Sequence, residues 1–110
     1  MKQDSEVKNQ VKKILEAVKK FSPGKSVELR IPPYAAIQCV AGITHRRGTP
    51  PNVVEMSAET LIKLLENPSQ WHEFCDLGLI CASGTNSNLT HLFLVVSKLI
   101  NSEVGSEYGK

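Results

Sequence analysis

Apolar residues in the first part of the chain recur every three or four positions, which is typical of one buried face of a helix. Between residues 5 and 21 they are Val7, Val11, Ile14, Leu15, Val18 and Phe21. Ser5 is a suitable cap for the start of this helix. Ser22-Pro23-Gly24 predicts its end, because proline cannot continue the ladder of hydrogen bonds. Residues 27–31 then alternate strictly between apolar and polar, which predicts a strand with one buried and one wet face.

Two further strands are expected on either side of a loop rich in proline. Pro32-Pro33 breaks the first strand, so the next strand, at about residues 35–43, is predicted to pair back antiparallel. Residues 44–52 contain one glycine and two prolines, which favours an irregular loop. Residues 53–56 form a short third strand.

Helices dominate the second half of the pattern. Ser57 is expected to cap a helix that stops at Asn67-Pro68, and Ser69 begins another that Gly78 ends. Residues 79–82 are apolar on both faces, which predicts an interior strand. A polar turn at 84–88 leads into a last helix that runs to about residue 101.

These elements predict an α+β fold, because the first three strands follow one another with no helix between them. We expect a single domain over residues 1–110, with a mixed, mostly antiparallel sheet and helices packed on one face. The chain has 110 residues, which is a usual length for a single domain. Residues 1–4 and 102–110 are expected to be flexible.

Composition narrows the classes of function. A net charge of +2 and an aromatic fraction of 5% argue against nucleic acid as a partner. Cys39, Cys75 and Cys81 are an odd set without paired spacing, so neither a disulfide scaffold nor a zinc site is expected. The start of the chain lacks the apolar segment of a secretory signal, and the apolar run at 92–96 is far below the roughly 20 residues that span a bilayer. We therefore expect a cytoplasmic protein with no cofactor, no metal and no stable membrane insertion.

An ordered series of residues in the second half carries a family resemblance: Ser57, Leu61, Leu65, Asn67-Pro68, Phe74, Gly78, Leu79 and Gly84. This order resembles the sterol carrier protein family, whose domains run strand, capped helix, Asn-Pro, second helix, glycine, strand, glycine and final helix. The string Arg47-Gly48-Thr49-Pro50-Pro51-Asn52-Val53-Val54-Glu55 is similar, more narrowly, to a bacterial branch of that family. The resemblance covers about residues 27–96. It implies a mixed sheet with helices on one face, and an apolar tunnel that takes lipid-like ligands in better-known members.

Two features depart from the lipid-carrying relatives. The loop at 44–52 replaces their strand-turn region, and the chain closes in Tyr108-Gly109-Lys110 where they carry a peroxisomal ending.

The last helix has more apolar surface than one sheet face requires. Its stripe at helical spacing consists of Leu89, Leu92, Phe93, Val96, Leu99 and Ile100, and Leu94 and Val95 widen it. A leucine left exposed forfeits about 1.5–3 kcal/mol of burial, so a pocket, a dimer partner or deep packing between neighbouring elements should cover it. The side chains expected to line a ligand pocket, with plain core as the alternative, are Leu61, Leu65, Trp71, Phe74, Leu92, Phe93 and Val96.

The loop residues His45, Arg46 and Arg47 are the candidates for binding an acidic head group. A guanidinium offers a planar fork that fits a carboxylate or phosphate, and backbone N–H groups of the turn at 84–88 could add donors. The alternative is a set of surface ion pairs, for example with Glu55.

The exposed lysines of the first helix favour a solvated face over contact with an anionic membrane, because Glu6 and Glu16 interrupt them. These lysines are Lys8, Lys12, Lys13, Lys19 and Lys20.

The chain shows no familiar spacing of nucleophile, base and orienting group, and no phosphate-binding glycine motif. The leading hypothesis is therefore non-enzymatic binding of a hydrophobic or amphipathic, lipid-like molecule. The alternative is an interaction module that kept the fold without a cavity and self-associates through the last helix. An enzyme that uses His45 and Arg47 on a small anionic substrate stays open.

Overall fold

The computed structural model describes the backbone of residues 2–43 and 48–108, and the side chains of residues 5–43 and 48–102. Its elements, in chain order, are α1 (Lys2–Phe21), β1 (Val27–Ile31), β2 (Ala35–Cys39), β3 (Asn52–Met56), α2 (Ala58–Glu66), the 3₁₀ turn η1 (Pro68–Gln70), α3 (Trp71–Asp76), β4 (Ile80–Ser83) and α4 (Thr90–Tyr108).

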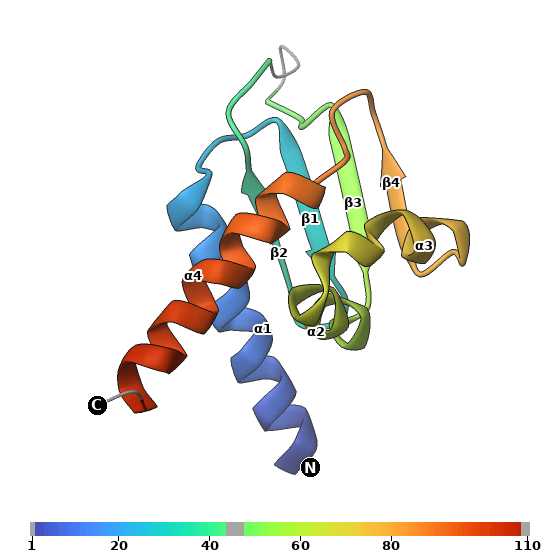
Figure 1. Ribbon diagram of the computed structural model, residues 1–110. Coiled ribbons are helices and arrows are strands. Elements are labelled where there is room, and N and C mark those ends of the chain that lie inside the picture. The colour runs from blue at the N-terminus through green and yellow to red at the C-terminus, as the bar shows by residue number, and fades with distance from the viewer. Residues whose placement is uncertain (1, 44–47, 109–110) are drawn as a thin grey trace.

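The sheet has four strands in the order β2-β1-β3-β4. β1 pairs antiparallel with β2, as the break at Pro32-Pro33 predicted, and β3 pairs antiparallel with β4. β1 and β3 run parallel. Figure 1 shows the helices gathered in front of this sheet. The expected α+β fold, with a mixed, mostly antiparallel sheet and one helical layer, is confirmed.

Alternation along the strands separates a buried face from a wet one. On β1 the side chains of Val27, Leu29 and Ile31 are fully buried. The wet face carries Arg30, whose guanidinium lies 3.2 Å from a carboxylate oxygen of Glu28 and 3.7 Å from one of Glu55. The hydrogen bond to Glu28, with the nearby negative charges, raises the pKa of Arg30. This face is therefore solvated and locally paired.

The core fills the space between the sheet and the helices. Ser57 caps α2 as expected, since its hydroxyl oxygen accepts a hydrogen bond from the Thr60 N–H at 3.1 Å. The largest fully buried side chain is Phe93 of α4, and Leu61 and Leu64 of α2 are also fully buried.

Among the described residues, no helix is both long enough and apolar enough to cross a membrane.

The prediction of an interior strand at residues 79–82 is wrong. β4 lies at the edge of the sheet, and of its residues only Ile80 is buried. The remaining positions, Cys81, Ala82 and Ser83, have small side chains. Cys81 and Ala82 are apolar enough to imitate an interior strand in the sequence, but their small side chains have little surface to bury.

Several element ends also differ from the expectation. β2 stops at Cys39 instead of about residue 43, because Val40 adopts a left-handed φ of 67° and turns the chain toward the loop after α1. α1 begins at Lys2 and α4 continues to Tyr108. Phe21 and Leu99, both expected on buried faces, are 42% and 45% exposed.

Candidate functional site

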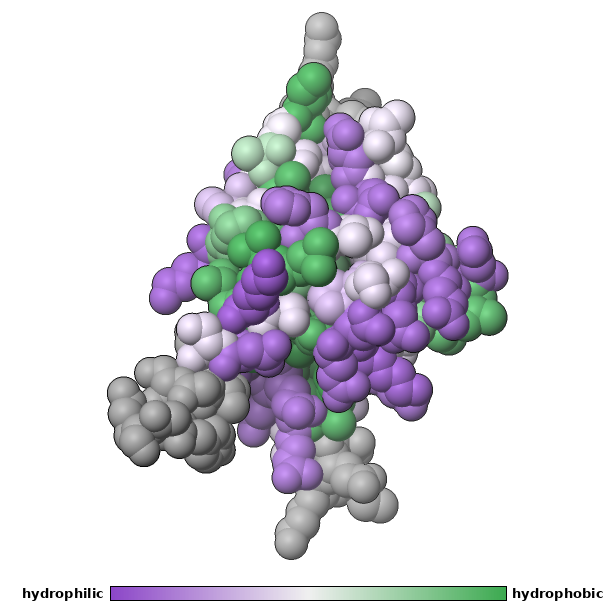
Figure 2. All heavy atoms as spheres, in the orientation of Figure 1, coloured by the Kyte–Doolittle hydropathy of each residue, from purple (hydrophilic) through white to green (hydrophobic). Residues whose placement is uncertain are grey.

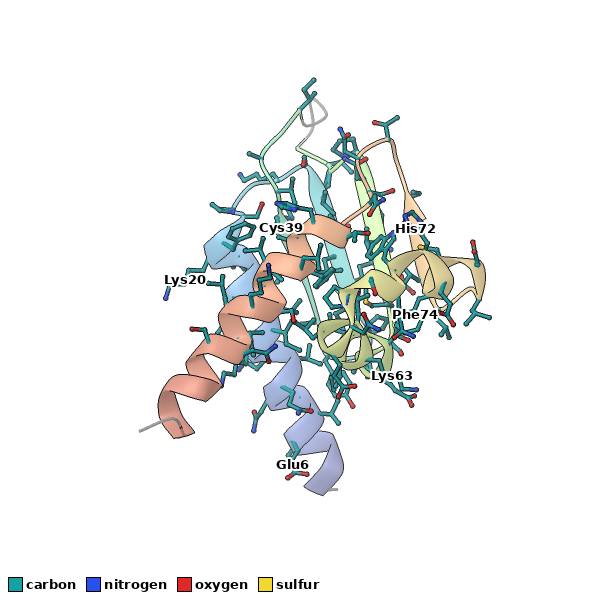
Figure 3. The ribbon with its side chains drawn as sticks, viewed as in Figure 1. Glu6, Lys20, Cys39, Lys63, His72 and Phe74 are labelled. Atoms are coloured by element: carbon teal, nitrogen blue, oxygen red, sulfur yellow. The ribbon has the colours of Figure 1, made fainter. Side chains whose placement is uncertain are left out.

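The side chains expected to line a pocket lie together in the structure as densely packed core. Leu61, Phe93 and Val96 are fully buried, and Trp71, Phe74 and Leu92 are 2–6% exposed. The rings of Trp71 and Phe93 stack with their centroids 6.3 Å apart. Figure 3 shows Phe74 within the helical layer. The seventh, Leu65, is half-buried. A ligand role for this set stays a prediction, because the side chains fill the space between one another.

A spacious hollow lies at the end of the molecule where the loops gather. We call it the loop-end groove; its volume is about 850 Å³. In Figure 1 this is the upper end, where the loops beside β1, β2 and β4 meet the start of α4. Its lining residues are Phe21, Ser22, Ser26, Val40, Ala41, Gly42, Ile43, Pro51, Asn52, Gly84, Thr85, Asn86, Asn88, Leu89, His91 and Leu92. This volume falls within the roughly 300–1,000 Å³ that is usual for small-molecule sites.

Asn52 holds three segments of the groove together. Its side-chain N–H donates to the Ser26 carbonyl at 2.9 Å, and its side-chain oxygen accepts from the Asn86 N–H at 3.0 Å. Asn52 is 3% exposed, so the bond to Ser26 is buried, and the bond to Asn86 is partly buried. Gly84 leaves room for this amide: it has φ +104°, and a Cβ there would collide with the side-chain oxygen of Asn52. The frame of the groove therefore depends on an asparagine and a glycine.

A second set of hydrogen bonds fixes the wall on the α1 side. The Ser26 hydroxyl donates to the Val40 carbonyl at 2.8 Å, and the Val40 N–H donates to the Ser22 carbonyl at 2.8 Å. Gly24 packs so closely on this turn that a Cβ would strike the Val40 backbone. The left-handed Val40 is held by these contacts, which offset its backbone strain.

The lining combines apolar side chains with polar groups. Phe21, Val40, Ile43, Leu89 and Leu92 offer apolar contact. Ser22, Thr85, Asn86 and His91 provide hydrogen-bonding groups around them. Such a surface accepts an amphipathic molecule, because apolar contact supplies affinity and a few polar groups fix orientation.

The start of α4 is already capped by its own chain. The Asn88 side-chain oxygen accepts from the Thr90 N–H at 3.0 Å and from the Thr90 hydroxyl at 2.6 Å. The Ser87 hydroxyl donates to the Gly84 carbonyl at 2.9 Å. These bonds define the shape of the polar turn at the groove's rim.

The predicted anion site at His45, Arg46 and Arg47 lies outside the described residues. The chain enters that segment from Ile43, which lines the groove. Glu55, suggested as an ion-pair partner for these arginines, has a carboxylate oxygen 3.7 Å from the guanidinium of Arg30. The head-group assignment stays a prediction.

A smaller hollow of about 280 Å³ lies between α1, α2 and α4, and half-buried Leu65 borders it together with Ile14, Ile62 and Ile100. The Ser97 hydroxyl donates to the Leu65 carbonyl at 2.8 Å across this gap. That bond joins α4 to α2, so the hollow is a seam between helices.

Two cysteines have a pKa that departs from the ordinary value. Both values are raised, so neither of these thiols is activated. Burial raises the pKa of Cys39 to about 11. Burial, with the charges of Asp76 and Cys81, raises the pKa of Cys75. All three cysteines are free thiols. In the part of the chain that the structure describes, no three His, Cys, Asp or Glu side chains gather into a potential metal site.

Sequence reasoning missed Asn52, Ser26 and Phe21 as residues of the groove. One signal was present: Asn52 stands in the same alternation as Val54 and Met56, so it is a polar residue at an inward position of a strand. A buried polar side chain there requires hydrogen-bond partners.

The fold defines the class of protein: an α+β domain with one layer of helices over a four-stranded mixed sheet. A family model described as bacterial SCP ortholog matches residues 3–95, and the chain belongs to this family. The resemblance to the sterol carrier protein family is thereby confirmed. No curated protein matches the chain.

Proposed function

We propose that the protein binds a hydrophobic or amphipathic, lipid-like molecule without reacting with it, and that the loop-end groove holds the molecule. The observation that carries this proposal is the groove itself, which combines a volume of about 850 Å³ with apolar walls and a polar rim. Burial of apolar surface at roughly 25 cal/mol per Å² would supply the affinity.

The rim supplies partners for the polar end of such a molecule. Asn86 and His91 are exposed there and lie beside apolar Leu89 and Leu92. His45, Arg46 and Arg47 are proposed to add positive charge toward an acidic head group.

Leu92 supports a route from the groove toward the interior. It lines the groove and also belongs to the buried core, so it borders both regions. An acyl chain too long for the groove would extend past Leu92, among the packed side chains of Trp71 and Phe93. The proposed roles of Leu61, Leu65, Trp71, Phe74, Phe93 and Val96 belong to this deeper portion.

Native mass spectrometry of protein purified from cells, followed by lipid extraction, tests the proposal directly. The expected result is a bound species with the mass of a lipid-like molecule. A fluorescent fatty acyl probe should then bind the purified protein and be displaced by the extracted molecule. A ligand-free protein that also ignores the probe would overturn the proposal.

Two exposed leucines provide a matched control for variants of the groove. Phe21→Ser and Ile43→Ser remove apolar lining and should weaken probe binding about tenfold each. Leu77→Ser and Leu79→Ser remove leucines that are 64% and 45% exposed and do not line the groove. Equal losses in both pairs would show that the probe binds apolar surface indiscriminately.

A second candidate function is self-association through α4, which Leu94 and Leu99, 40% and 45% exposed, favour. Light scattering before and after replacing Leu94 and Val95 with serine separates the two functions. A fall in mass with unchanged probe binding would support self-association. An unchanged monomeric mass would eliminate it.

The proposed location is the cytoplasm, since three free thiols suit a reducing compartment. An enzyme that uses His45 and Arg47 is disfavoured if His45→Ala and Arg47→Ala both complement a deletion fully.

A further inference from the structure

None of the acidic residues lies in the segments that build the loop-end groove. The chain has 11 of them, and none occurs at residues 17–27, 29–54 or 77–102. Every residue that lines the groove comes from these three stretches. Lys19, Lys20 and Lys25 are exposed in the first stretch. The lining of the groove thus contains no carboxylate, and three exposed lysines lie on the segment that leads from α1 into it.

The lysines lie beside the groove on the α1 side. Lys19 and Lys25 border one shallow hollow at the end of α1, next to β2. Figure 3 shows Lys20 projecting outward from the upper part of α1, whereas Glu6 lies near the opposite end of the same helix. Glu6 therefore interrupts the lysines only at the far end of α1, whereas Glu16 lies one helical turn before Lys19 and Lys20.

Two large apolar side chains accompany these cations. Ile43 is 87% exposed and Phe21 is 42% exposed, and both line the groove. Figure 2 shows apolar atoms at the same upper end of the molecule. Phe21 directly follows Lys20, which places an aromatic side chain next to the lysines.

We infer that this end of the molecule docks on an anionic lipid bilayer. Phe21 and Ile43 enter the boundary between head groups and acyl chains, and Lys19, Lys20 and Lys25 contact the anionic head groups. Apolar insertion combined with a basic patch is what reversible membrane binding requires. The mouth of the groove then opens toward the bilayer. The inference extends the proposed function by naming the partner that supplies or receives the ligand.

A membrane explains both features, whereas nucleic acid explains one. The phosphates of a nucleic acid would form ion pairs with the lysines, but they make no favourable contact with an exposed isoleucine. The net charge of +2 is also small for a nucleic-acid-binding surface.

Flotation with lipid vesicles tests the docking. The protein should float with vesicles of phosphatidylcholine mixed with phosphatidylglycerol and not with phosphatidylcholine alone. Binding should weaken as the salt concentration rises, because screening limits the distance over which charges interact to about 10 Å at 0.1 M.

Two triple variants of equal charge test the location of the contact. Lys19→Gln/Lys20→Gln/Lys25→Gln should lower vesicle binding about a hundredfold, since each lysine near an anionic surface contributes about fivefold. The matched control is Lys8→Gln/Lys12→Gln/Lys13→Gln, which changes exposed lysines elsewhere on α1 by the same total charge. The control should retain most of the binding.

Ile43→Ser should also lower vesicle binding, and Leu77→Ser should not. The inference is overturned if both lysine triples lose binding equally, if Ile43→Ser leaves it unchanged, or if duplex DNA competes fully with the vesicles. Probe binding without vesicles separates the two proposals, because none of the three lysines lines the groove. Vesicle binding without probe binding would leave docking intact and remove the proposed function. Probe binding without vesicle binding would do the reverse.

Discussion

The interior and the loop-end groove differ in how they are held together. Between the sheet and the helices, side chains such as Phe93, Leu61 and Leu29 are fully buried, and their apolar contacts stabilise the interior. Around the groove, Asn52 and Ser26 join three loops through hydrogen bonds. Dense apolar packing removes space, whereas a hydrogen-bonded frame of loops keeps a hollow open. The difference indicates that a binding site in this domain is built where packing ends.

Phe93→Ala should give the largest effect and tests the interior most directly. Deleting a fully buried ring that stacks on Trp71 should lower the free energy of unfolding by about 3–5 kcal/mol. Urea denaturation followed by circular dichroism measures this loss. Leu99→Ala on the same helix is the control, because Leu99 is 45% exposed. A loss below about 1 kcal/mol would mean that the interior is loose enough to open for a ligand.

Alkaline pH should weaken the interior through Cys39. Burial raises the pKa of this thiol from 9.0 to about 11 in the folded protein. Between these values the unfolded chain releases the proton while the folded chain keeps it, so stability falls as pH rises from about 9 to 11. At the upper end the loss should reach about 2–3 kcal/mol. Denaturation of Cys39→Ala should lack this part of the decline, and Cys81→Ala should retain it.

Asn52→Ala tests the frame of the groove. It removes the bonds to the Ser26 carbonyl and the Asn86 N–H, and should lower the free energy of unfolding by about 1–2 kcal/mol. Probe binding should fall more than stability does, because the segments that shape the groove are released. Gly84→Ala should act in the same way, since its Cβ meets the Asn52 side chain. Unaltered probe binding in a destabilised Asn52→Ala protein would place the ligand elsewhere.

Leu99→Ser should give the smallest effect. A side chain that is 45% exposed and remote from the groove should change stability by less than about 0.5 kcal/mol if the protein is a monomer. Thermal unfolding at several protein concentrations measures this. A larger loss that grows with concentration would show that α4 is buried in a self-associated form.

Much of the fold was predictable because local patterns and tertiary packing agree. The alternation at residues 27–31 gave a strand with one buried face, and Ser57 began a helix that Asn67-Pro68 ended. The interior-strand prediction for residues 79–82 failed because apolar character alone does not distinguish Ile80, which is buried, from Ala82, which is not. Strand order depends on contacts between distant segments, and spacing along the chain does not encode it.

The candidate site was less predictable than the fold. The apolar side chains singled out from helical spacing lie close together, but as packed core; among them Leu92 alone lines the loop-end groove. The groove draws its residues from the end of α1 and the loop after it, from the start of β3, from the loops after β2 and β4, and from the first turn of α4. Of the lining residues, only Pro51, Asn52 and Gly84 belong to the residues that carried the family resemblance, and these gave no indication of a groove.

The sequence by itself determined the α+β class, the sterol carrier protein-like family and the composition of the core, because periodicity and capping are local properties. Only the tertiary structure decided which apolar residues pack and which remain exposed. It brought Ser26, Asn52 and Asn86 together across long stretches of chain, and it left Phe21 and Ile43 uncovered at the same end of the molecule. A hollow is formed by segments that are adjacent in space and not in sequence, so its position follows from the packing of the whole chain.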